Sequence, residues 1–199
     1  MRTVRIIEQI SLDGVIQAPG ARDEGGDNYP HGGWTAPYRS PAGAEAIAAA
    51  QGERFDLLLG RRTYDIFAAY WPKAGNGSIA NGLNAATKYV ATHRPDSLAW
   101  GPVKDLGADI IGGVRTVKAT DGPDLVVWGS STLTSMLLEQ RLVDEVLLVV
   151  YPILLGRGKR FFADTADPRQ LALVSTKVVS SHVLMNAYRY VGRWEGVRA

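Results

Sequence analysis

The chain has 199 residues, 46% of them hydrophobic and 21% charged, which is typical of a globular protein with a substantial core. Its 22 basic and 20 acidic residues are interspersed and give a net charge of +2, so no basic stripe indicates a nucleic-acid partner. Cysteine is absent and only 3 histidines occur, which excludes disulfides and cysteine-ligated zinc and argues against any metal site.

The N-terminus carries charges throughout and lacks the apolar core of a signal peptide. No window reaches the roughly 18 apolar residues that a membrane span requires. We therefore expect a single domain over residues 1–199, located in the cytoplasm, with neither a membrane nor a nucleic-acid partner.

The first part of the chain predicts a strand, a long loop and a helix. Residues 4–12 have the apolar pattern of a strand. Residues 17–38 are rich in Gly, Pro, Asp and Asn and predict a long loop, whose aromatic residues argue against disorder. A serine N-cap followed by proline at the first helical position predicts a helix over residues 40–52.

The middle of the chain predicts further strands. Residues 55–59 form a short apolar run that turns at Gly60 into a helix. Residues 88–92 predict the next strand, and weaker strand signals lie at residues 109–111 and 124–128.

The last part of the chain predicts a second glycine turn and three strands. Gly129 breaks the run over residues 124–128 and leads into a helix. Residues 143–153 predict a long strand, and residues 171–179 and 182–191 predict a hairpin around Ser180-Ser181.

This order predicts an α/β fold in three layers, with a mostly parallel central sheet and an antiparallel hairpin at its C-terminal edge. Ligands bind such sheets beyond the carboxyl ends of the strands. Gly60 and Gly129 both fall at such ends, where a helix N-terminus offers free N–H groups to a phosphate. An ordinary strand–helix connection remains the alternative for each of them.

Four segments together resemble one family. They are Ser11-Leu12-Asp13-Gly14, Gly60-Arg61-Arg62-Thr63-Tyr64, Gly129-Ser130-Ser131 and residues 154–162. In this order and spacing they resemble the reductase domain of bifunctional riboflavin-biosynthesis proteins, a branch of the dihydrofolate-reductase-like superfamily. The resemblance extends from Val4 to about Tyr190 and implies a dihydrofolate-reductase-like fold with NADPH as the cofactor.

The resemblance also implies which residues contact NADPH. Arg61 and Arg62 offer permanent charge to phosphate oxygens, although a solvated helix face is the alternative for both. The implied contacts to the nicotinamide, the pyrophosphate and the adenosine 2′-phosphate are Gly14, Val15, Gly60, Arg61, Arg62, Thr63, Thr92, His93, Arg94, Gly129, Ser130, Ser131 and Thr132.

The substrate and catalytic residues are less well defined. Candidate walls of the substrate pocket are Trp34, Tyr64, Phe67 and Tyr151, with core packing as the alternative. Dihydrofolate reductases place a catalytic carboxylate on the helix after the first loop, where this chain has only Glu45. We expect Glu45 to lie in the first helical turn and to complement the helix dipole. Asp13 is the other candidate acid.

The sequence thus predicts an NADPH-dependent oxidoreductase that transfers a hydride to a small heterocyclic or ribosylamino-pyrimidine-like substrate, as 5-amino-6-(5-phosphoribosylamino)uracil reductases do. A deazaflavin-dependent reductase and a non-catalytic nucleotide-binding module remain alternatives. A zinc-binding deaminase domain is excluded by the absence of cysteine. The apolar run over residues 143–151 and the predicted edge hairpin favour a homodimer.

Overall fold

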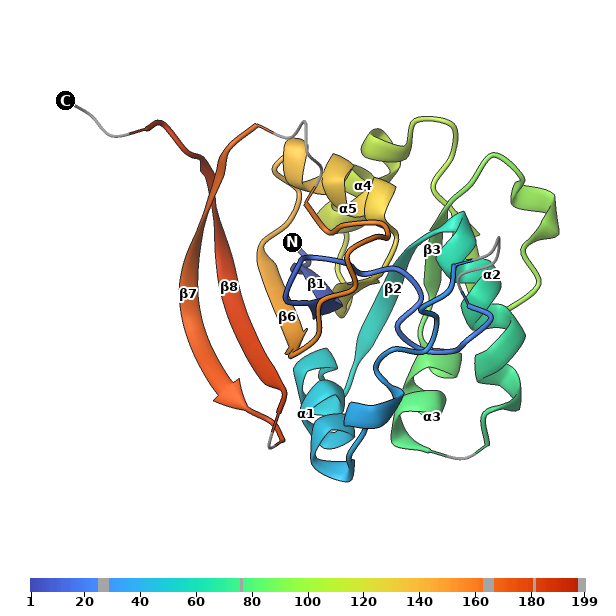
Figure 1. The fold of residues 1–199 in the computed structure, drawn as a ribbon. Helices are drawn as coiled ribbons and strands as arrows, with labels where there is room; N and C mark the ends of the chain where they lie inside the picture. The colour runs from blue at the N-terminus through green and yellow to red at the C-terminus, as the bar shows by residue number, and fades with distance from the viewer. Residues whose placement is uncertain (25–28, 76, 163–166, 181, 197–199) are drawn as a thin grey trace.

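The computed structural model describes residues 1–24, 29–75, 77–162, 167–180 and 182–196 (Figure 1). Within these residues, eight strands form one sheet in the order β4-β3-β2-β5-β1-β6-β8-β7. The strands are β1 Val4–Ser11, β2 Phe55–Gly60, β3 Lys88–Ala91, β4 Val103–Asp105, β5 Asp124–Trp128, β6 Glu145–Tyr151, β7 Arg169–Val178 and β8 Leu184–Arg193. The α-helices are α1 Pro41–Gln51, α2 Arg61–Tyr70, α3 Ser78–Ala85, α4 Ile110–Ala119 and α5 Ser131–Glu139.

The sheet is parallel except at its C-terminal edge, as the sequence predicted. β1 lies between β5 and β6 and is parallel to both, and β2 is parallel to β3 and β5. β8 is antiparallel to both β6 and β7. The β7–β8 hairpin forms the edge seen at one side of the molecule in Figure 1. The turn predicted at Ser180-Ser181 includes Ser181, which lies outside the described residues.

Helices cover both faces of the sheet and complete the three predicted layers. One face of β1 carries Ile6 and Ile10, which belong to the core cluster that α4 and α5 cover. The opposite face carries Ile7 in a second cluster that α2 and α3 cover. α1 packs against this second cluster and against a third one that includes Tyr151 at the end of β6.

Local signals explain where α1 begins and ends. The Ser40 hydroxyl accepts a hydrogen bond from the Gly43 N–H at 3.0 Å, and Pro41 occupies the first helical position. Gly52 ends the helix with a φ of 85°, a left-handed conformation that favours glycine. The sequence predicted this helix correctly.

The prediction of a weak strand at residues 109–111 is wrong. Asp109 is the N-cap of α4, and its carboxylate accepts a hydrogen bond from the Gly112 N–H at 2.9 Å. A pair of isoleucines fits a strand or a buried helix equally well, so the capping aspartate was the better signal. The short elements α3 and β4 were not predicted. No helix within the described residues is long and apolar enough to cross a membrane.

Candidate active site

Six parallel strands of the described chain end at one edge of the sheet. β1, β2, β3, β4, β5 and β6 end there at Ser11, Gly60, Ala91, Asp105, Trp128 and Tyr151. β2 and β5 are neighbours, so the glycine turns that follow them lie side by side. This arrangement brings the two predicted phosphate-binding segments together.

A hydrogen-bonded serine joins the two glycine turns. The Gly60 N–H donates to the Ser130 hydroxyl at 2.8 Å, and that hydroxyl lies 2.9 Å from the Thr63 hydroxyl. Gly129 and Ser130 are both left-handed, with φ values of 53° and 60°. A serine in this conformation is costly, and its contacts to β2 and α2 hold it there. A Cβ on Gly129 would lie 3.3 Å from the Thr63 hydroxyl oxygen, so glycine suits this turn for space as well as for φ.

The helices that start from these turns have open N-termini. No side chain within the described residues caps α2 or α5, and neither has an acidic residue in its first turn. α1 and α4, in contrast, are capped by Ser40 and Asp109. The first N–H groups of α2 and α5 are therefore available to an anion at the edge of the sheet.

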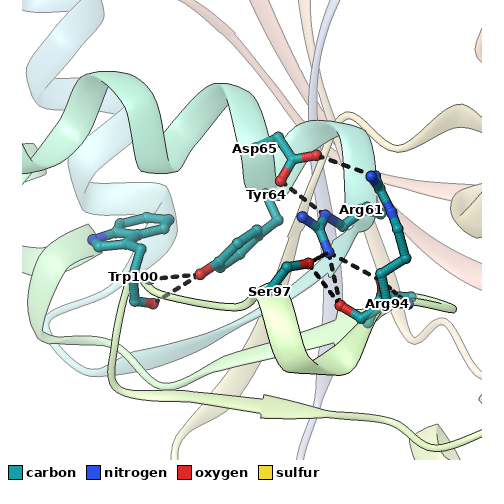
Figure 2. A network of polar contacts seen from close by, with 7 residues as sticks. Arg61, Tyr64, Asp65, Arg94, Ser97 and Trp100 are labelled. Atoms are coloured by element: carbon teal, nitrogen blue, oxygen red, sulfur yellow. Dashed lines mark hydrogen bonds and ion pairs between the residues drawn. The ribbon is translucent and has the colours of Figure 1, made fainter.

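A polar network links the ends of β2 and β3 (Figure 2). The Arg61 guanidinium lies 2.8 Å from the Asp65 carboxylate, 2.7 Å from the Ser97 hydroxyl and 2.9 Å from the Arg94 carbonyl. The Arg61 guanidinium is thus bound by groups of the protein itself. The Arg94 side chain is 70% exposed and lies 3.9 Å from Asp65. Two arginines and one aspartate give the network a formal charge of +1, with Arg94 as the exposed cation.

The other residues predicted at the adenosine end differ in exposure. Thr92 is buried, and its hydroxyl accepts a hydrogen bond from the Arg94 N–H at 3.0 Å. His93 and Arg62 are exposed. Thr92 therefore shapes the loop, whereas the residues beside it are accessible from solvent.

Asp13 anchors the loop after β1 to the loop after β6. Its carboxylate accepts hydrogen bonds from the Ser11 hydroxyl at 2.6 Å, the Leu155 N–H at 3.1 Å and the Gly156 N–H at 2.7 Å. Desolvation raises the pKa of Asp13, but these hydrogen bonds outweigh it and lower the pKa to about 2. Asp13 is ionised at neutral pH and has no proton to donate there, which argues against it as the catalytic acid.

Gly14 and Val15 follow Asp13 in the same turn. Gly14 is left-handed with a φ of 85°, and Val15 is buried and forms a β-bridge with Arg160. Arg160 also donates a hydrogen bond to the Asp13 carbonyl. The turn predicted to face the nicotinamide is thus held in place by the loop after β6.

The predicted roles of Tyr64 and Phe67 as substrate walls need correction. Tyr64 is only 1% exposed, and its hydroxyl accepts a hydrogen bond from the Trp100 N–H at 2.6 Å (Figure 2). Phe67 packs against the rings of Trp71 and Trp100. Both residues lie on the inner side of α2, where aromatic side chains at helical spacing form core.

Trp34 and Tyr151 lie next to each other, as two residues that line the same pocket must. Their rings meet edge to face at 5.4 Å, and both are buried in the third core cluster. Burial raises the pKa of Tyr151 to about 12, so its phenol is neutral. The Tyr151 hydroxyl lies 3.5 Å from the Gln9 amide oxygen. Their role towards a substrate remains a proposal.

The expected position of Glu45 is wrong. α1 begins at Pro41, so Glu45 lies in the second turn, and the first turn of α1 contains no acidic residue. Its side chain is exposed. Ser40 supplies the N-terminal cap instead. Glu45 therefore does not complement the helix dipole from the first turn.

Sequence reasoning missed two buried polar groups beside the glycine turn. The Trp128 Nε1 atom and the Glu8 Oε2 atom are buried without a hydrogen-bond partner among the described residues. Desolvation raises the pKa of Glu8 well above its ordinary value, although the backbone N–H groups of Gln9 and Gly129 act in the opposite direction. The sequence contains one signal for Glu8, since it is an acidic residue at an inward position of an otherwise apolar strand.

A groove runs beside the first turn of α5. It has a volume of about 510 Å³ and is lined by Ser131 and Thr132, by other residues of α5, and by Lys159 and Arg160. Two residues predicted to bind the cofactor thus share a groove with two cations.

These features define the class of protein. A mostly parallel sheet with an antiparallel C-terminal edge, and glycine turns at the ends of β2 and β5, form an α/β fold of the dihydrofolate-reductase-like type. The profile of the RibD C-terminal domain matches residues 2–185, so the chain belongs to the RibD C-terminal domain family.

Two proteins of Bacillus subtilis are similar to the chain in sequence. The chain is 27% identical over 140 residues to the uncharacterized protein YyaP of Bacillus subtilis, covering 68% of this chain and 74% of YyaP. The uncharacterized protein YwjB of the same organism is 24% identical over 133 residues, which is 67% of this chain and 72% of YwjB.

Three solved structures share the fold at low identity. A putative riboflavin biosynthesis protein from Shewanella has a TM-score of 0.63 and 18% identity, covering 95% of this chain and 99% of that one. Dihydrofolate reductase from Enterococcus faecalis, complexed with NADP(H) and RAB-propyl, has a TM-score of 0.60 and 17% identity, covering 94% and 96%. A Thermotoga maritima diaminohydroxyphosphoribosylaminopyrimidine deaminase/5-amino-6-(5-phosphoribosylamino)uracil reductase has a TM-score of 0.64 and 13% identity, covering 96% of this chain and 57% of that one.

Proposed function

We propose that this protein is an NADPH-dependent reductase that acts on a small heterocyclic substrate related to ribosylaminopyrimidines. The main support is the pair of glycine turns joined by Ser130, which presents two open helix N-termini at the ends of neighbouring strands. The family and the NADP(H) complex of the similar Enterococcus dihydrofolate reductase agree with a nicotinamide cofactor.

The residues present fit such a cofactor. Gly129 has no side chain to block approach to the turn, and the first N–H groups of α5 suit a pyrophosphate. A hydrogen-bond chain runs from the Gly60 N–H through the Ser130 hydroxyl to the Thr63 hydroxyl. The Ser130 hydroxyl also lies 3.2 Å from the Trp128 carbonyl oxygen, and when it donates to Thr63 instead, the Thr63 hydroxyl keeps its own proton for a phosphate oxygen. Arg94 would contact the 2′-phosphate from the network at the end of β3.

NADPH, when bound, would supply the hydride. The residues of this chain bind the cofactor, orient it and exclude water. The turn at Asp13 and the loop after β6 would cover the nicotinamide end, since Asp13 holds them together through Leu155 and Gly156.

The substrate would lie on the face of the sheet that α1 covers. The Trp128 indole N–H is buried there without a partner among the described residues and suits a carbonyl oxygen of a pyrimidine-like ring. The Gln9 amide and the Tyr151 hydroxyl are neighbouring polar groups. Trp34 would support Tyr151 from behind.

Cofactor titration tests this proposal, because the five tryptophans of the chain can report binding by fluorescence quenching. We expect NADPH to bind about tenfold or more tightly than NADH, since a charge-assisted contact to the 2′-phosphate contributes roughly 1.5–3 kcal/mol. Equal dissociation constants would contradict the predicted NADPH preference.

Binding of a reduced deazaflavin alone would favour the deazaflavin alternative, and binding of neither cofactor would favour a non-catalytic module. Pterins and ribosylaminopyrimidines should then be screened for turnover.

A further inference from the structure

Glu8 lies where β5 separates from β1. The pairing of β1 with β5 ends at Ile7 and Trp128, whereas the pairing of β1 with β6 continues to Ser11 and Tyr151. Glu8 is therefore the first residue of β1 beyond the end of β5, next to the left-handed turn at Gly129. This fork lies at the edge of the sheet that the proposed cofactor would occupy.

The side chains packed around Glu8 are apolar. The polar groups that act on it are the backbone N–H groups of Gln9 and Gly129, which lower its pKa, and the Glu24 carboxylate, which raises it. Its side chain is 2% exposed and lies on the same face of β1 as Ile6 and Ile10, which pack with Leu133 and Leu137 of α5. No cation within the described residues forms an ion pair with it. A carboxyl group in such a place is favoured in its neutral form, because ionisation in an apolar interior is costly.

One oxygen of this carboxyl has nothing to bond within the described part of the chain. The Oε2 atom is buried and has no hydrogen-bond partner there. A neutral carboxylic acid carries an O–H that is a hydrogen-bond donor, and a buried donor without an acceptor weakens the folded protein. An unpaired group of this kind next to a binding turn is explained if a ligand supplies the missing acceptor.

We propose that Glu8, as a neutral acid, donates a hydrogen bond to an acceptor oxygen of the cofactor bound at the Gly129 turn. This inference rests on the proposed function. The neutral form is compatible with an anionic cofactor, whereas an ionised carboxylate at the fork would repel it. Glu8 thereby becomes a cofactor-binding residue that is distinct from the arginines at the adenosine end.

Two substitutions separate this role from simple packing. Glu8→Gln stays neutral and keeps a donor, so it should retain NADPH affinity within about threefold of wild type. Glu8→Leu removes the donor and should raise the dissociation constant about tenfold or more. Glu8→Leu should also raise the melting temperature, because it removes a buried unpaired polar atom. A gain of stability combined with a loss of binding is not expected of a residue that only packs.

Asn186→Leu is the matched control. The Asn186 Oδ1 atom is likewise buried without a partner among the described residues, but it lies on β8, two strands away from β1. This variant should bind NADPH as wild type does. Weakened binding in Asn186→Leu to the same extent as in Glu8→Leu would overturn the specific role of Glu8.

Infrared spectroscopy gives a readout independent of turnover. The wild-type minus Glu8→Gln difference spectrum of the free protein should show the C=O band of a protonated carboxylic acid at neutral pH. This band should move to lower frequency when NADPH saturates the site. NADPH binding with an unmoved band, together with normal affinity in Glu8→Leu, would overturn the Glu8 proposal and leave the proposed function standing. Failure of the wild-type protein to bind NADPH would overturn both.

Discussion

At the scale of residues, two carboxylates of the first strand and its turn show how the environment sets protonation. Asp13 accepts several hydrogen bonds at the surface and is ionised, whereas burial among apolar side chains raises the pKa of Glu8 well above its ordinary value. The same type of group is thus shifted in opposite directions at two nearby positions. Neither role follows from the residue type alone.

The neutral Glu8 predicts a pH dependence of stability. Above its ordinary pKa of 4.5, Glu8 ionises in the unfolded chain but stays protonated in the folded protein. The unfolded state then binds fewer protons, so stability falls as the pH rises, by about 1.4 kcal/mol per pH unit, until the folded pKa is reached. Urea denaturation from pH 5 to pH 8 should show this slope as the difference between wild type and Glu8→Gln. Parallel stability curves would contradict it.

The exposed position of Glu45 predicts that it is not essential for turnover. Glu45→Gln should change stability by less than about 1 kcal/mol and leave the rate almost unchanged, because the side chain has no buried environment in which to act as an acid. A working substrate from the pterin and ribosylaminopyrimidine screen is needed for the assay. Loss of about a hundredfold or more in rate from a stable variant would identify Glu45 as the general acid.

At the scale of elements, the two strand–turn–helix units lie side by side and are joined by hydrogen bonds. β2 and β5 are adjacent, so their turns meet, and Ser130 joins them through Gly60 and Thr63. The left-handed backbone at Gly129 and Ser130 is stabilised by this contact between units. Changes in the turn should therefore affect ligand binding more than global stability.

Gly129→Val should abolish NADPH binding in a protein that remains folded. The substitution combines a left-handed φ of 53° with a side chain directed at the Thr63 hydroxyl. Gly52→Val is the matched control, since Gly52 has a φ of 85°, a Cβ added there would meet no atom within 4 Å, and it lies before β2 at the opposite edge of the sheet. Circular dichroism and fluorescence titration should show two folded variants, of which Gly129→Val alone fails to bind. Unchanged affinity in Gly129→Val would refute the placement of the cofactor.

Arg94 and Arg61 should behave differently when the preference for NADPH is measured. Arg94→Gln removes the exposed cation and should reduce the NADPH preference over NADH about tenfold, with little effect on stability. Arg61→Gln removes the residue that holds Asp65, Ser97 and the Arg94 carbonyl together, so it should lower the melting temperature as well. An Arg94→Gln variant with unchanged cofactor preference would place the 2′-phosphate elsewhere.

At the scale of the whole molecule, the edge hairpin is the most exposed apolar region of the described chain. Val174 and Val178 of β7 are 68% and 73% exposed, and Leu173 beside them is also exposed. The apolar run over residues 143–151 does not itself form an edge, because β6 is paired on both sides. We therefore propose that the protein forms a homodimer and that β7 and β8 form the interface between its two subunits.

Light scattering at micromolar concentration should show a dimer. Val174→Glu combined with Val178→Glu should yield a folded monomer, because charges on an edge strand oppose pairing. Tyr70→Glu, at an exposed apolar residue of α2 outside the hairpin, should leave the dimer intact. A wild-type protein that is monomeric under these conditions would end this proposal.

The sequence by itself determined the features that depend on neighbouring residues. The buried strands, the glycine turns at Gly60 and Gly129, and the cap of α1 all follow from short patterns that act within one element. Together with the order of the motifs, they were sufficient to predict the fold class and the family. Residues 109–111 were misassigned because a short apolar run does not distinguish a strand from a helix.

Only the tertiary structure decided which side chains of the candidate site are buried, exposed or paired. Arg61 is occupied by Ser97 and the Arg94 carbonyl, and Tyr64 is buried against Trp100, because the chain brings residues 33 to 36 positions apart into contact. The pKa of Glu8 is raised because strands and helices from distant parts of the chain exclude water around it. Burial and partners set the charge and availability of a group, and both arise only when distant segments pack together.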